Sequence, residues 1–148
     1  MTAVLDYSPA VIVQRYLAST SVGTLPSASA AWPIGVNSQL KPDNTITVYD
    51  TEGQIQGRIQ VTKGVVTQHG LQFRIRGVDQ NTAYAKAKAI LEEIDKACDE
   101  TIVIESSVFS LGGIHRKGSI VSMGRETPDN VSRFLFSINA LVTLEQLS

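Results

Sequence analysis

A strand that leads directly into an amphipathic helix, between Gly70 and Cys98, constrains this chain more than any other stretch. Apolar and polar residues alternate from Leu71 to Arg76, and this period of two predicts a strand with one buried face and one wet, cationic face. From Asn81 the apolar residues follow the period of a helix, which predicts a main helix over residues 81–98. Such a helix packs back on the strand, so we expect this unit to form the core. We also expect Cys98 to be buried on the apolar stripe of the helix.

Length and composition bound the class of protein. The chain has 148 residues, which fits a single domain over residues 1–148. Thirteen basic and 14 acidic residues give a formal charge of −1, so no overall charge draws the chain to nucleic acid or to a membrane surface. No apolar run reaches the roughly 18 residues of a membrane span, and the N-terminus has no basic and apolar signal pattern. One cysteine permits no internal disulfide and suits a reducing compartment.

The first third of the chain reads as an N-terminal helix and an irregular loop, over residues 1–44. Ser8 and Pro9 form a helix start, with Ser8 as the N-cap. From Ser19 the composition changes to small residues without a period, interrupted by Trp32. Two interpretations of Trp32 stay open: it pins the loop to the core, or it is an exposed anchor for another subunit.

The remaining segments predict strands. Residues 45–77 are expected to form strands with an extended, mobile hairpin arm over residues 51–64, where glycines recur. Residues 101–148 are expected to form a C-terminal three-stranded meander, with a turn at Leu111-Gly112-Gly113. The fold class that follows is α+β: a mostly antiparallel, twisted sheet with two helices packed on it and a long β-hairpin arm.

No group of residues predicts catalysis, a cofactor or a metal. The two histidines, His69 and His115, each lie in a predicted strand without a second ligand at metal-binding spacing. The glycine-rich stretches lack the spacing of phosphate-binding loops. We therefore expect a protein that is not an enzyme and that has no catalytic, metal or cofactor residues.

Charge is distributed unevenly along the chain. Two stretches carry basic residues without any acid, and the end of the predicted helix is acidic. The basic residues that we consider for a subunit interface or a lumen are Arg58, Arg74, Arg76, Arg116 and Arg125, together with Trp32. Three interpretations stay open: a solvated sheet face, a basic edge that meets the acidic helix of the next copy in a head-to-tail ring, or basic strands that contact nucleic-acid phosphates.

Several motifs together resemble a family of phage proteins. They are Thr45-Ile-Thr-Val-Tyr-Asp-Thr-Glu-Gly53, Gly70-Leu-Gln-Phe-Arg-Ile-Arg-Gly77 followed by a helix of the Ala-Tyr-Ala-Lys-Ala-Lys type, a Leu-Gly-Gly turn, and Arg133-Phe-Leu-Phe-Ser-Ile-Asn139. This pattern, over about residues 40–145, resembles the bacteriophage minor capsid and tail-completion proteins that belong with the tail terminators of long-tailed phages.

The resemblance implies a structural virion protein, present in the host cytoplasm before assembly. Its subunits would form a ring, typically a homohexamer, at the head-proximal end of the tail. The implied partners are further copies of the chain, the tail tube protein, the head connector or stopper protein, and DNA that passes through the lumen without sequence recognition. The alternatives are a head-completion or stopper-type neck protein, or a nucleic-acid-binding α/β module.

Overall fold

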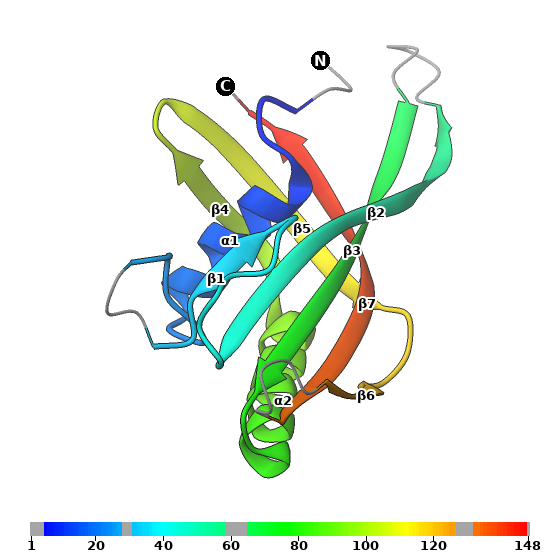
Figure 1. Ribbon diagram of the computed structural model, residues 1–148. Coiled ribbons are helices and arrows are strands. Elements are labelled where there is room, and N and C mark those ends of the chain that lie inside the picture. The colour runs from blue at the N-terminus through cyan, green and yellow to red at the C-terminus, as the bar shows by residue number, and fades with distance from the viewer. Residues whose placement is uncertain (1–4, 28–30, 59–64, 127–131, 148) are drawn as a thin grey trace.

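In the part of the chain that the structure describes, the fold consists of two helices and one large sheet (Figure 1). The computed structural model describes residues 5–27, 31–58, 65–126 and 132–147. In chain order the elements are α1 (Pro9–Ser19), β1 (Ile34–Val36), β2 (Thr45–Arg58), β3 (Val65–Gly77), α2 (Gln80–Lys96), β4 (Cys98–Ile104), β5 (Ser107–Arg116), β6 (Val121–Glu126) and β7 (Arg133–Gln146).

The sheet is mixed, with the strand order β1-β2-β3-β7-β5-β4 and β6 paired to β7. Among the described strands only β1 runs parallel to its neighbour, and the other pairings are antiparallel. The predicted α+β class is therefore confirmed. The short strand β1 lies inside the stretch predicted to be an irregular loop, where three residues are too few to show a period.

One face of the sheet forms the core. Leu71, Phe73 and Ile75 of β3 are at most 1% exposed, and both helices pack on this face. The predicted start of α1 is confirmed, because the side chain of Ser8 caps the helix and Pro9 is its first residue. Asp50 of β2 accepts a hydrogen bond from the backbone N–H of Ala10 at 2.9 Å, which fixes the first turn of α1 against the sheet.

The main helix ends earlier than the sequence predicts. It begins after its N-cap residue Asp79 and ends at Lys96, so Cys98 is the first residue of β4 instead of the last residue of the helix. The prediction of a buried Cys98 is wrong, since this residue is exposed. The helical period extends by chance past Ala97, whose backbone has already turned to the extended conformation.

The C-terminal part is not a three-stranded meander, and Leu111-Gly112-Gly113 is not a turn. These residues lie inside β5, where Gly112 occupies a β-bulge opposite β7. The actual turn, at Glu105 and Ser106, contains no glycine and uses a positive φ of 54° at Glu105. After β5, residues 117–120 interrupt the pairing, and β6 continues along the same edge of β7.

The predicted hairpin arm is built from the outer parts of β2 and β3. Beyond Gln68, β3 no longer pairs with β7, so within the described part of the chain residues 55–58 and 65–67 pair only with each other and project from the sheet (Figure 1). The tip of the predicted arm, residues 59–64, lies outside the described residues, so the expectation of mobility there stays a prediction. At the base of the arm, a bulge in β2 brings Gly53 and Gly70 close to the opposite backbone.

The two glycines at this base are required by close approach. A Cβ at Gly53 would overlap the carbonyl oxygen of Gln68, and a Cβ at Gly70 would overlap the carbonyl oxygen of Glu52. We predict that Gly70→Ala lowers the free energy of unfolding by about 2–3 kcal/mol, because backbone atoms cannot move aside cheaply. Gly118→Ala is the matched control, since no atom lies within 4 Å of a Cβ there, and its effect should stay within about 0.5 kcal/mol. Urea denaturation measures both, and equal effects would contradict the role assigned to Gly70.

Candidate functional site

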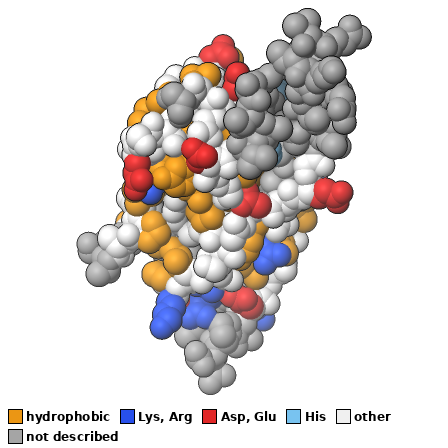
Figure 2. Space-filling view, turned by 90° about the horizontal axis from the view of Figure 1, so that it is seen from above, with side chains coloured by type: hydrophobic (Ala, Val, Ile, Leu, Met, Phe, Trp, Pro, Cys, Tyr) orange, Lys and Arg blue, Asp and Glu red, His pale blue; other side chains and the backbone are white. Residues whose placement is uncertain are grey.

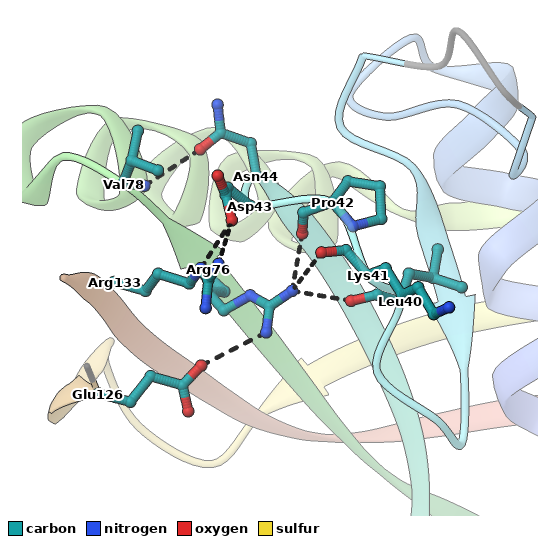
Figure 3. Close-up of polar contacts among 9 residues, drawn as sticks. All are labelled: Leu40, Lys41, Pro42, Asp43, Asn44, Arg76, Val78, Glu126 and Arg133. Carbon is teal, nitrogen blue, oxygen red and sulfur yellow. Dashed lines mark hydrogen bonds and ion pairs between the residues drawn. The ribbon is translucent and has the colours of Figure 1, made fainter. Parts of the chain in front are cut away.

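The most completely bonded polar group on the second face of the sheet is the guanidinium of Arg76. Its side chain comes from β3, and the residue is only 8% exposed. Nη2 donates to the carbonyl oxygens of Leu40 at 2.8 Å and of Pro42 at 2.7 Å (Figure 3). These carbonyls belong to the segment between β1 and β2, so one charged group holds a loop that is distant in sequence.

Two further side chains complete the surroundings of Arg76. Turning the Gln39 amide by 180° lets its oxygen accept from Nε at 3.0 Å and from Nη1 at 2.7 Å. Nη1 also forms an ion pair with Oε1 of Glu126 on β6 at 3.4 Å, where the carboxylate side chain is 37% exposed. Because of this exposure, the ion pair contributes little, and the bonds to the loop carbonyls are the main constraint.

The same loop is fixed at two more points. Arg133, at the start of β7, donates from Nε and Nη2 to Oδ1 of Asp43 at 2.7 and 2.6 Å (Figure 3). Asn44 accepts a hydrogen bond from the backbone N–H of Val78 at 3.2 Å. We call Arg76, Arg133, Asp43 and Asn44 the loop clamp. Sequence reasoning missed Arg133 and Asp43 as partners, and it located only the end of the loop, at residue 44.

The expectation of a wet cationic face on β3 is wrong for Arg76 and only partly right for Arg74. The alternation of residues identifies the face correctly, but the clamped loop covers its end. Arg74 is half-buried, lies over the ring of Tyr49 at 5.1 Å, and donates from Nε to Gln72 at 3.1 Å. Both arginines thus have partners within the subunit.

The other arginines considered from the sequence do not lie beside Arg74 and Arg76. Arg116, at the end of β5, is exposed and pairs with Asp95 of α2 at 3.4 Å. Arg125 is exposed on β6 and lines a hollow of about 230 Å³ with Gln80 and Phe134. Arg58 is the last residue of β2, and its side chain lies outside the description. The structure therefore distributes the predicted arginines over separate surfaces.

Trp32 is half-buried against α2. Its surroundings agree in part with each of the two interpretations, a residue that pins its loop and an exposed anchor. The ammonium group of Lys86 lies 5.3 Å from the centre of its ring and donates to the carbonyl oxygen of Val22 at 2.8 Å. Burial lowers the pKa of Lys86. Trp32 adopts a positive φ of 51° and, with Ala85 and Ala89, lines an open hollow of about 450 Å³. The side chain thus pins its loop and still presents a surface.

Charge on the surface is mixed. The view from above shows separate acidic side chains spread over the face, exposed hydrophobic side chains between them, and Lys and Arg gathered mainly towards the lower end (Figure 2). Among the described residues, no three His, Cys, Asp or Glu side chains are grouped to hold a metal. Burial lowers the pKa of the half-buried His69. No helix in the described part is both long and apolar enough to cross a membrane.

Comparison of the sequence with protein-family models and with curated proteins finds no match.

The loop clamp predicts a measurable effect on stability. Arg76→Met keeps the length of the side chain but leaves the carbonyls of Leu40, Lys41 and Pro42, and the carboxylate of Glu126, without their donor. We expect the free energy of unfolding to fall by about 2–3 kcal/mol, and the amides of residues 38–44 to exchange their hydrogens faster. Arg116→Met is the matched control, because its exposed ion pair contributes about 0–1 kcal/mol. Unchanged exchange in the loop would contradict the clamp.

The placement of Cys98 predicts its reactivity. The thiol is exposed, and the neighbouring carboxylate of Asp99 raises its pKa. In dilute protein we expect one thiol to react with a maleimide without denaturant, whereas a thiol on the helix stripe would need unfolding. Asp99→Asn should speed alkylation at pH 7, because a lower pKa increases the thiolate fraction. A slower or unchanged rate would contradict the influence of Asp99.

Proposed function

We propose that this protein is a structural component of a tailed-phage virion, of the tail-terminator or tail-completion type. In this proposal, copies of the chain form a ring at the head-proximal end of the tail, where the ring caps the tail tube and joins it to the head connector. The ring encloses a lumen through which DNA passes. The protein has no catalytic role in this proposal.

The observation that carries the proposal is the strand-to-helix unit β3–α2 within a mostly antiparallel sheet that is extended by the β2–β3 arm. This unit contains Gly70-Leu-Gln-Phe-Arg-Ile-Arg-Gly77, the motif on which the resemblance to the phage family mainly rests. An arm that pairs only with itself suits contact with a neighbour, because its backbone is available outside the sheet.

The alternative of a nucleic-acid-binding module has less support. Its main candidates were Arg74, Arg76 and Arg116, and each of them already has a partner within the subunit. Phosphate contacts from these side chains would require those partners to be given up. DNA in the lumen of a ring needs no such specific contacts.

Assembly at high protein concentration tests the proposal. We expect mass measurement and negative-stain microscopy to show closed rings, and these rings to bind the ends of tubes assembled from the tail tube protein of the same genome. A strict monomer that also fails to bind tube ends would contradict the proposal. Binding to duplex DNA that falls steeply with salt, without rings, would favour the nucleic-acid-binding alternative.

A further inference from the structure

Exposed apolar side chains gather at the two ends of β7. The large apolar residues that are exposed in the described chain are Leu25, Val78, Tyr84, Val103, Val121, Met123 and Leu147. Four of them belong to β6 or to the segment that leads from β3 into α2, and both of these elements lie beside the start of β7. Val103 and Leu147 lie at its other end. Grouped apolar residues on a surface are typical of contact with another molecule.

The start of β7 borders the hollow of about 230 Å³ that Arg125 lines, and we call this space the β6 hollow. Phe134 and Phe136 of β7 form its apolar part, and Ser122 of β6 and Gln80 of α2 lie at its polar side. Arg125 is opposite Phe134 in the β6–β7 ladder, so it is on the helix side of the sheet, as the hollow is. A cavity of roughly 150 Å³ holds a group as large as benzene. The β6 hollow is therefore large enough for one aliphatic side chain.

The other end of β7 presents an exposed leucine on a fixed backbone. The N–H of Leu147 donates to the carbonyl oxygen of Val108 at 2.7 Å, and Val108 pairs in turn with Val103 of β4. The three residues thus form one row across β7, β5 and β4. This row lies on the sheet face away from the helices, because the neighbours of Val103 in the strand, Ile102 and Ile104, are buried in the core. Leu147 is 55% exposed.

The two ends of β7 carry opposite charges. Arg125 is exposed beside the β6 hollow. Glu145 is exposed two residues before Leu147, and the alternation of a strand puts both on the same face. Neither Arg125 nor Glu145 forms an ion pair with another described residue. An apolar side chain next to an acid at one end thus matches an apolar hollow next to a base at the other.

The two ends cannot meet within one subunit. β7 has 14 residues. At about 3.4 Å per residue, such a strand spans roughly 40 Å. Figure 1 shows the C-terminus at the end of the sheet away from β6. Any contact between Leu147 and the β6 hollow is therefore a contact between two copies of the chain.

We propose that the β6 hollow of one subunit receives Leu147 of the next subunit, with Glu145 of that copy beside Arg125. This inference rests on the proposed function, since it names a contact between subunits of the ring. Removal of Leu147 and the two phenylalanine rings from water drives the contact, and the charge pair sets its orientation. The two surfaces differ, so the contact is head-to-tail, and each subunit offers one of each.

Cysteine cross-linking tests the contact. In a Cys98→Ser background, Leu147→Cys and Ser122→Cys together should give a ladder of covalent multimers on oxidation, and either one alone should give no covalent dimer. Both positions are exposed, so the substitutions leave the core intact. Leu25→Cys with Ser122→Cys is the matched control and should give no ladder, because Leu25 is also an exposed leucine but lies at neither end of β7.

Association without a covalent bond tests the leucine and the charge pair separately. Leu147→Asp should weaken self-association at least about tenfold, whereas Leu25→Asp should leave it unchanged. Arg125→Glu and Glu145→Arg should each weaken it at least about tenfold, and the double variant should return it to within about threefold of the natural chain. Sedimentation measures association, and circular dichroism checks that each variant is folded.

The outcomes separate the contact from the function. Rings without a cysteine ladder, or a ladder that the Leu25→Cys control gives equally, would overturn this contact and leave the proposed function standing. A ladder from a protein that does not bind tail-tube ends would support the contact and remove the function. A protein that stays monomeric at every concentration would overturn both.

Discussion

The buried guanidinium of Arg76 is the interaction on which the second face of this sheet depends. β3 is central: its apolar side supports both helices, and its other side would be solvated if no segment covered it. Arg76 binds the carbonyls of Leu40 and Pro42 and so holds the segment that joins β1 to β2 across the end of this face. Arg133 fixes the same segment through Asp43. A lysine could not replace this planar group, because its single ammonium cannot reach the loop carbonyls, the Gln39 amide and Glu126 together.

Local periodicity was sufficient to predict much of the fold. The alternation in β3, the helical stripe of α2 and the Ser8-Pro9 start of α1 each depend on neighbours in sequence, and each is present. What failed depended on distant contacts. A glycine pair reads as a turn, but Gly112 is a bulge in a strand because β7 lies beside it. The short strand β1 forms through its parallel pairing with β2, and no local sequence pattern indicates this pairing.

The candidate site shows the same limit. The sequence identified Arg74 and Arg76 as residues on one face, but it could not show that Tyr49 and the clamped loop already occupy them. It did not single out the residues that complete the clamp, since Asp43 and Arg133 are 90 positions apart. Conversely, the bulge in β6 and the free edges of β4 and β6 follow from the pairing of distant strands, which no local pattern indicates.

The subunit is stabilised by its core and its loop clamp. The central proposal is that copies of this chain form a closed ring that binds the end of the tail tube. The most direct measurement is a cryo-electron microscopy map of the protein at assembly concentration. We expect this map to show a closed ring of subunits. Separate subunits, or an assembly that does not close, would contradict the proposal.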